Sequence, residues 1–219
     1  MPPRIALVHT TPAAMPPVHA AFRRHYPEAE RFDLLESSLL PDLQQAKSFE
    51  PAFKRRITEL ITYCERAGAD AVLVTCSSYS PVTDLAASMV AIPVFKADEA
   101  LVQAAVARGP RIGLLATVPT APAPAVAQLE DEARRAGKPV AISVRLCAGA
   151  YEALMAGDGA RHDELVVQGV RAVAPSVDVI ALAQYSMARA MPVLPTNLEV
   201  EVLSAPDQAV QRIAERFRG

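Results

Sequence analysis

The sequence predicts an α/β protein built from two similar lobes, and three observations lead to that prediction. Short runs rich in Val, Ile and Leu alternate with longer amphipathic segments throughout the 219 residues. Most of the short runs are apolar throughout, which is typical of strands buried on both faces of a parallel sheet. The first half of the chain also resembles the second half at a nearly constant spacing. We therefore expect each lobe to hold a short, mostly parallel sheet flanked by helices.

The short apolar runs are the predicted strands, because each is brief and rich in β-branched or other apolar residues. They are residues 5–8, 32–35, 71–75, 93–95, 112–116, 141–144, 179–183 and 201–203. Apolar residues recur at helical spacing in the segments between them, which predicts amphipathic helices. These are residues 16–25, 49–67, 97–108, 121–136, 162–174 and 206–218.

The repeat divides the chain into two copies of one α/β unit. Residues 4–12 align with residues 111–119 at an offset of 107, and residues 70–78 align with residues 178–186 at an offset of 108. Residues 94–97 match residues 202–205, again at an offset of 108. Three matches in the same order predict a first lobe of residues 1–97 plus 206–219 and a second lobe of residues 98–205. The two lobes are expected to be pseudo-symmetric, with an active-site cleft between them.

Composition excludes several classes of function. The formal net charge of −2 gives no electrostatic reason to expect a nucleic acid or an anionic membrane as partner. No apolar run reaches the roughly 20 residues of a membrane helix, and the N-terminus lacks the pattern of a secretory signal. Three cysteines without a CxxC pair fit a reducing cytoplasm. Because no motif for a nucleotide or a metal is present, we expect neither a cofactor nor a metal site.

Polar loops follow four of the predicted strands, where ligands bind in open α/β sheets. If the two copies face each other, these loops line one cleft. The candidate substrate-binding residues are His9, Thr10, Ser77, Ser78 and Tyr79 in the first copy, and Thr117, Thr120, Gln184, Tyr185 and Ser186 in the second.

Cys76 is the candidate catalytic residue. It lies between a strand end and a helix start, with Ser80 as the expected N-cap and Pro81 as the first helical residue. Backbone N–H groups at such a place favour an anion, either a thiolate or a bound carboxylate. A small buried core cysteine is the alternative. His9 is similarly open: it could be an acid, a base, a carboxylate-binding donor or a hydrogen-bonded structural histidine.

Taken together, these residues resemble the aspartate/glutamate/hydantoin racemase superfamily, which also contains arylmalonate decarboxylase and maleate isomerase. The resemblance covers nearly the whole chain and includes residues 72–78, 112–117 and 149–154. It implies cofactor-independent chemistry in which two cysteines, one from each lobe, flank the α-carbon of the substrate. Cys76 matches the first-lobe cysteine, whereas Gln184 occupies the second position. A carboxamide cannot exchange a proton near neutral pH, so the usual pair of thiols is incomplete. His9 stands where glutamate racemases usually have an acidic residue.

Several reactions remain compatible with one thiol. The resemblance implies a racemase-like isomerase acting at the α-carbon of a small carboxylic acid or its derivative, with Cys76 as acid, base or nucleophile. A decarboxylase of a malonate-like acid, a cis–trans isomerase of a maleate-like acid and a non-catalytic carboxylate-binding protein stay open. Each would bind a small carboxylate, whose negative charge requires hydrogen-bond donors. Members of the family are often homo-oligomers, and the sequence leaves the oligomeric state open.

Overall fold

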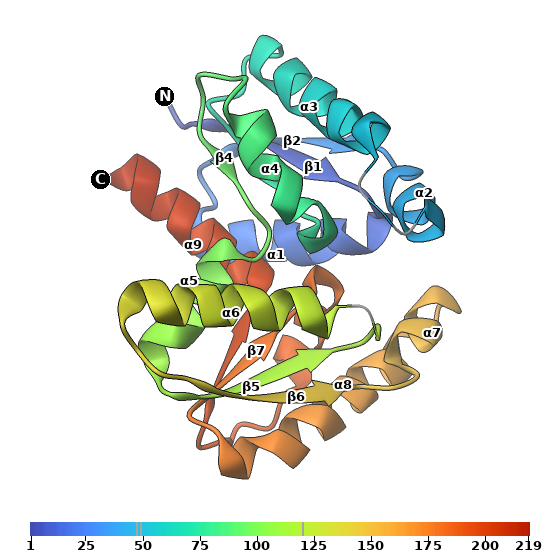
Figure 1. Cartoon of the computed structure of the whole chain (residues 1–219), viewed down its shortest axis with the longest axis vertical. Helices are drawn as coiled ribbons and strands as arrows, with labels where there is room; N and C mark the ends of the chain where they lie inside the picture. Colours follow the sequence, from blue (N-terminus) through green and yellow to red (C-terminus); the bar gives the residue numbers. More distant parts are fainter. Residues whose placement is uncertain (47, 49, 120) are drawn as a thin grey trace. The chain divides into compact units, whose positions relative to one another are not determined.

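The computed structural model describes residues 1–46, 48, 50–119 and 121–219. The chain divides into two compact units (Figure 1). One comprises Met1–Glu99 with Ala209–Gly219, and the other comprises Ala100–Gln208. Each unit holds a four-stranded sheet in which every pair of neighbouring strands is parallel. The predicted fold class, two parallel sheets flanked by helices, is therefore confirmed.

The sheet of the first unit has the order β2-β1-β3-β4. Its strands are β1 (Arg4–His9), β2 (Glu30–Leu35), β3 (Ala71–Val74) and β4 (Val94–Phe95). β1 and β3 are buried apart from the first residue of β1, since each has a neighbour on both sides. The edge strand β2 is only partly buried and carries Glu30, Arg31 and Asp33.

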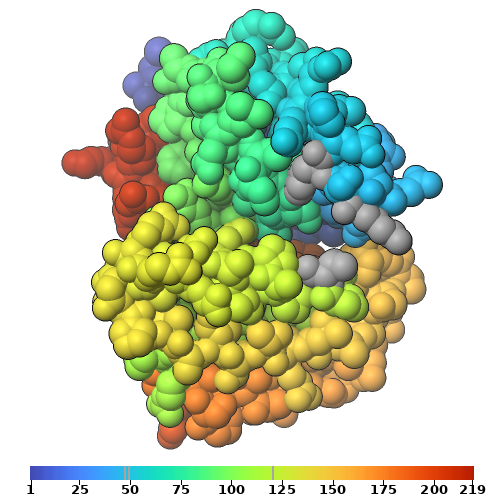
Figure 2. Space-filling model, in the orientation of Figure 1, coloured from blue at the N-terminus to red at the C-terminus, as the bar shows by residue number. Residues whose placement is uncertain are grey.

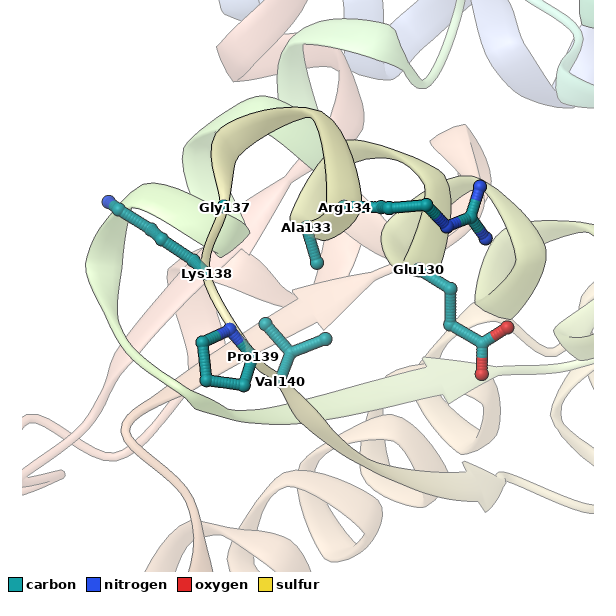
Figure 3. A pocket seen from close by; sticks show the side chains of 7 residues that line it. All are labelled: Glu130, Ala133, Arg134, Gly137, Lys138, Pro139 and Val140. Carbon is teal, nitrogen blue, oxygen red and sulfur yellow. The ribbon is translucent and has the colours of Figure 1, made fainter.

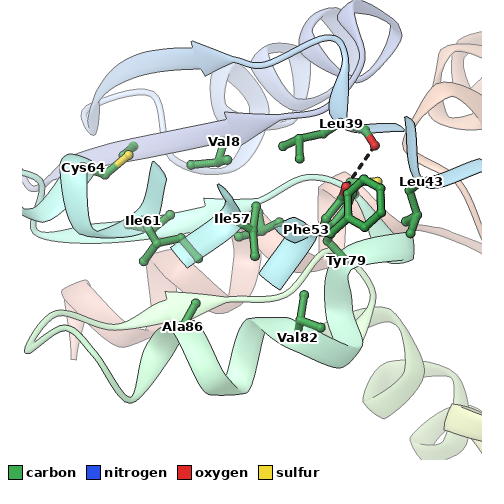
Figure 4. Close-up of a cluster of buried hydrophobic side chains, with 14 of the residues drawn as sticks. Val8, Leu39, Leu43, Phe53, Ile57, Ile61, Cys64, Tyr79, Val82 and Ala86 are labelled. Carbon is green, nitrogen blue, oxygen red and sulfur yellow. Dashed lines mark hydrogen bonds between the residues drawn. The ribbon is translucent and has the colours of Figure 1, made fainter. Parts of the chain in front are cut away.

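The main core of the first unit lies between the sheet and two helices, α3 (Pro51–Arg66) and α4 (Ser80–Ala87). Ile57 and Ile61 of α3 and Val82 of α4 pack on side chains of β1 and β3 (Figure 4). A short helix, α2 (Leu39–Ala46), adds Leu39 to this cluster. The first unit also contains α1 (Met15–His25) and, from Ala209 on, the helix α9 (Ala205–Arg218). None of the described helices is both long and apolar enough to span a lipid bilayer.

The second unit repeats this plan with the strand order β6-β5-β7-β8. Its core packs α8 (Gly159–Val173) on the central strands. Gly113 of β5 (Arg111–Ala116) permits the close approach, because a Cβ there would lie 2.6 Å from Val173 of α8. α6 (Pro122–Ala136) lies on the surface (Figure 2). An ion pair joins Asp131 and Arg134 along this helix. The strands are β5 (Arg111–Ala116), β6 (Ala141–Leu146), β7 (Val179–Leu182) and β8 (Glu201–Ser204). The helices are α5 (Glu99–Arg108), α6 (Pro122–Ala136), α7 (Ala150–Met155) and α8 (Gly159–Val173).

All eight predicted strands are present, and their ends differ from the predicted ones by two residues at most. The predicted helix of residues 49–67 corresponds to α3, although its expected first residue, Phe49, lies outside the described residues. α8 begins three residues before its predicted start because Asp158 caps it by accepting the N–H of Arg161 at 3.0 Å. The short helices α2 and α7 are additions to the predicted set.

The predicted N-cap role of Ser80 is wrong. Ser80 is the first residue of α4, and the preceding Tyr79 occupies the cap position without a side-chain hydrogen bond. The Ser80 hydroxyl instead donates to the buried carboxylate of Asp98 at 2.7 Å. This hydrogen bond to a charged group is a strong one, and it holds the Ser80 side chain against Asp98.

Candidate functional site

The carboxyl ends of β1 and β3 bring Thr10 and Cys76 to the same edge of the first sheet. The two strands are parallel neighbours, with Val8 paired to Val74. Cys76 follows β3 in an extended conformation (φ −126°, ψ 110°) and precedes a single 3₁₀ turn, η2 (Ser77–Tyr79). Such a strand-to-turn junction directs successive N–H groups towards one point, which is a favourable place for an anion.

The Cys76 thiol is buried but surrounded by hydrogen-bond donors. Burial is the largest influence and raises the pKa of Cys76 above its ordinary value. The Thr10 hydroxyl, the N–H and hydroxyl of Ser78 and the N–H of Tyr79 act in the opposite direction. The thiol is therefore protonated near neutral pH, while donors for a thiolate or for a substrate anion lie around it.

Thr10 is the buried hydroxyl beside this thiol. Its side chain is 1% exposed, and within the described part of the chain its Oγ1 makes no hydrogen bond of ordinary geometry. Buried hydroxyls normally have a partner, so an unsatisfied one at a strand end indicates a group that a ligand or a thiolate can engage.

His9 is fully buried and both of its ring nitrogens have partners. Nε2 lies 2.9 Å from Oδ1 of Asp33 on β2, and Nδ1 lies 2.8 Å from the hydroxyl of Thr75. Burial is the largest influence on His9 and lowers its pKa, although the hydrogen bond to Asp33 and the charge of Asp33 oppose that shift. The structure thus places His9 beneath the strand ends, engaged with protein groups.

The η2 turn exposes its three residues to different degrees. Ser77 is partly buried and Ser78 is exposed, whereas Tyr79 is completely buried. The Tyr79 hydroxyl donates to the backbone carbonyl of Leu39 at 2.9 Å, within the apolar core (Figure 4). Ser77 and Ser78 are accordingly the members of this turn that solvent reaches, and Tyr79 connects the turn to α2.

The second unit holds Gln184 at the position equivalent to Cys76. Gln184 has the same extended backbone (φ −123°, ψ 144°) and precedes the 3₁₀ segment η4 (Tyr185–Val193). Its Oε1 accepts from the backbone N–H of Thr117 at 2.6 Å and from the Thr117 hydroxyl at 3.0 Å. Because a backbone N–H can only donate, the amide oxygen must face Thr117 and the amide nitrogen must face away.

The other predicted residues of the second unit lie on the same loops. Thr117 and Tyr185 are buried, and Ser186 is partly buried. Thr120 lies outside the described residues. The structure thus brings Cys76 together with Thr10 in one unit and Gln184 together with Thr117 in the other. The roles of these residues in substrate binding, and the cleft expected between the lobes, stay predictions.

Sequence reasoning missed Asp33, Thr75 and His19. Leu7 pairs with Asp33 across β1 and β2, so Asp33 shares a face of the sheet with His9, two residues beyond Leu7 on β1. His19 of α1 reaches the same carboxylate, with Nε2 3.0 Å from Oδ1 and 3.1 Å from Oδ2. The sequence offered one signal for this cluster, the charged residue Asp33 inside a short predicted strand.

A surface hollow at the end of α6 is separate from Gln184 of the same unit (Figure 3). Its lining comes from the last turns of α6 and from the segment that enters β6 at its amino end, whereas Gln184 follows the carboxyl end of β7. In a parallel sheet, the amino ends and the carboxyl ends of the strands lie on opposite sides of the sheet. Among the described residues, no group of three His, Cys, Asp or Glu side chains could hold a metal ion. The lining residues are Glu130, Ala133, Arg134, Gly137, Lys138, Pro139 and Val140.

The two parallel sheets and their flanking helices define a two-unit α/β protein. The chain belongs to the Asp/Glu/hydantoin racemase family, whose family model matches residues 6–213. This confirms the family resemblance seen in the sequence and assigns the chain to a family of isomerases. No curated protein sequence matches the chain.

Solved structures share the fold at low sequence identity. An aspartate racemase homologue from Pyrococcus horikoshii is 15% identical, covers 99% of both chains and has a TM-score of 0.73. Allantoin racemase from Klebsiella pneumoniae is 19% identical over 98% of this chain and 87% of its own, with a TM-score of 0.72. A mutant of arylmalonate decarboxylase is 20% identical over 99% of this chain and 94% of its own, with a TM-score of 0.67.

Proposed function

We propose that this protein is a cofactor-independent isomerase acting at the α-carbon of a small carboxylic acid or its derivative, with Cys76 as the group that transfers the proton. The observation that carries the proposal is the buried Cys76 thiol at a strand end, surrounded by donors from Thr10, Ser78 and Tyr79. Membership of a racemase family supports the reaction class.

Donors around the sulfur suit both the thiolate and the anion that forms on the substrate. When a Cys76 thiolate removes the α-proton, the C–H electron pair moves into an enediolate and the sulfur becomes a thiol. Preorganised N–H and O–H groups stabilise such a developing charge strongly in a site that excludes water. The unsatisfied hydroxyl of Thr10 and the N–H groups of η2 are the donors that the first unit offers.

Gln184 is proposed to bind the substrate rather than to exchange protons. Its amide oxygen is committed to Thr117, so its amide NH₂ is the group left to donate. A donated N–H suits a carboxylate oxygen. With no second thiol in this position, a water molecule or a substrate group would return the proton on the face away from Cys76.

A decarboxylase is the second candidate, and the raised pKa of Cys76 favours it. In that reaction the bond between the α-carbon and a carboxylate breaks, CO₂ leaves, and the enediolate takes the proton of the thiol. Solvent then reprotonates the thiolate. A thiol that is protonated at rest is the correct starting state for this single proton donation, which needs no second acid or base.

The test is a substrate screen with amino acids, hydantoins, arylmalonates and maleate, followed by chiral chromatography and CO₂ detection. We expect one class to turn over, and Cys76→Ala to abolish that turnover. Cys64→Ala is the matched control, because Cys64 lies in the apolar core of the same unit. Turnover that Cys76→Ala leaves unchanged would refute the proposal. Absence of turnover with any class, combined with thermal stabilisation by a small acid, would favour a non-catalytic binding protein.

A further inference from the structure

A partly exposed carboxylate, that of Asp33, joins two imidazoles beneath the strand ends that carry the site. Asp33 accepts from His9, which is fully buried, and from His19, whose side chain is 28% exposed. His9 in turn contacts Thr75, the residue immediately before Cys76. One hydrogen bond and one peptide unit therefore separate the His9 ring from Cys76.

The hydrogen bonds of His9 can be satisfied in both of its protonation states. A carboxylate can only accept, so Nε2 of neutral His9 carries the proton and Nδ1 accepts from the Thr75 hydroxyl. When His9 is protonated, Nδ1 donates to Thr75, and the Thr75 hydroxyl turns to the Val8 carbonyl, 3.2 Å away. Neither state leaves a buried donor without an acceptor, so His9 can take up a proton in place.

Protonation changes the net charge beneath the site. The charged and titratable groups that act on His9 are Asp33 on β2 and His19 on α1, and β3 contributes the neutral Thr75. With both histidines neutral, the cluster carries one negative charge, which opposes formation of a thiolate nearby. Protonation of His9 adds one positive charge to the cluster, whichever state His19 is in, and so offsets the charge of Asp33. The thiolate is then less strongly opposed.

We propose that His9 and Asp33 form a proton-sensitive positioning pair that adjusts the reactivity of Cys76, the His9–Asp33 geometry being coupled to the thiol through Thr75. The inference rests on the proposed function in taking Cys76 as the reactive group. It adds that the reactivity depends on pH through a residue that does not touch the substrate.

The experiment measures the rate at which methyl methanethiosulfonate labels Cys76 in the full-length protein between pH 4 and pH 9, followed peptide by peptide with mass spectrometry. For an isolated thiol, the rate falls tenfold for each pH unit below its pKa. In the unmodified protein we expect a shoulder on the acid side. On that side the labelling rate should exceed the rate expected for an isolated thiol by about threefold to tenfold. This is the size of effect that one unit charge produces on a nearby group in a partly screened medium.

Three variants of the cluster have different expected outcomes. His9→Gln should abolish the shoulder, since no proton can then bind at residue 9. Asp33→Asn should raise the labelling rate at neutral pH and move the shoulder to lower pH, because Asp33 is what favours the protonated form of His9. His19→Gln should keep the shoulder and move it to higher pH, because the charge of His19 disfavours protonation of His9.

His162→Gln is the matched control, because His162 is another fully buried histidine bonded to a carboxylate, that of Asp163 at 2.9 Å, in the second unit. It should leave the profile unchanged. A shoulder that survives His9→Gln, or that His19→Gln removes, would overturn the inference while leaving the proposed function intact. Failure of Cys76 to react at any pH in the native protein would overturn both. If His9→Gln does not fold, the opposite shifts expected of Asp33→Asn and His19→Gln decide the matter.

Discussion

The two units place equivalent strand ends in the same backbone conformation but equip them with different chemistry. In the first unit, Cys76 lies beside Thr10, and in the second, Gln184 lies beside Thr117. Thr10 and Thr117 are equivalent in the repeat. Each unit therefore has a threonine beside the residue that follows β3 or β7, which is Cys76 in the first unit and Gln184 in the second. The fold thus preserves the geometry of the pair, while only the first unit has a titratable group in it.

The residues beneath these strand ends differ in the same sense. His9 and Thr75 of the first unit correspond to Ala116 and Ala183 of the second. Asp33, paired with Leu7, corresponds to Val144, paired with Leu114. A hydrogen-bonded polar array thus supports the thiol, and small or apolar side chains support the amide. The comparison suggests a division in which the first unit transfers protons and the second supplies hydrogen bonds.

Replacing the thiol should have the largest effect. We expect Cys76→Ala to lower kcat by at least about a thousandfold, within the range of general acid–base catalysis. Cys147→Ala, in the core of the second unit, should retain activity once its thermal stability has been checked. A comparable loss of kcat in Cys76→Ala and Cys147→Ala would contradict the proposed difference between the units.

Removing the Gln184 amide should reduce activity less than removing the Cys76 thiol. Gln184→Ala is expected to lower kcat/KM about tenfold to a hundredfold, the cost of one hydrogen bond to a charged group, and to do so mainly through KM. Steady-state kinetics across substrate concentrations separate the two parameters. A loss confined to kcat would show that the second unit takes part in the chemical step.

Restoring the symmetry would sharpen the comparison further. Gln184→Cys places a second thiol beside Thr117, as Cys76 lies beside Thr10. We expect racemisation to increase relative to deuterium exchange at the α-carbon, since a base would then be available from each unit. Gln184→Ser is the control of similar size without a comparable acid, and it should not change this ratio.

Replacing Thr117, which binds the Gln184 amide oxygen, should have a smaller effect on activity than replacing Gln184. Thr117→Val removes the hydroxyl donor but keeps the backbone N–H, so one of the two bonds to Gln184 survives. A net loss of roughly 1 kcal/mol predicts a rise in KM of about fivefold. An effect as large as that of Gln184→Ala would mean that Thr117 acts on the substrate itself.

The strand pattern made the fold predictable, because buried parallel strands leave continuous apolar runs that a sequence displays directly. The two copies of the repeat align through these apolar runs, and that alignment identified Gln184 as the residue equivalent to Cys76. Short helices such as α2, with Pro41 inside it, leave too little periodic sequence to detect. The Asp33–His9 contact depends on the register of β1 and β2, and the Gln184–Thr117 contact depends on a side-chain rotamer. Neither can be inferred from spacing along the chain.

The smallest expected effect concerns stability. Burial lowers the pKa of His9 below its ordinary value of 6.5, so between that lowered value and 6.5 the unfolded chain binds more protons than the folded one. Stability therefore rises with pH through this window, and His9→Gln should flatten the rise. Urea unfolding at several pH values measures it. An unchanged slope would show that His9 does not contribute.

Deuterium exchange at the α-carbon tests most directly whether one unit alone transfers protons. An enantiomerically pure substrate found in the screen is incubated with the protein in D₂O, and incorporation and inversion are measured before equilibrium. We predict that incorporation with retained configuration exceeds inversion, and that Cys76→Ala shows neither. Inversion that keeps pace with incorporation in the unmodified protein would reveal a second base and contradict the division between the units.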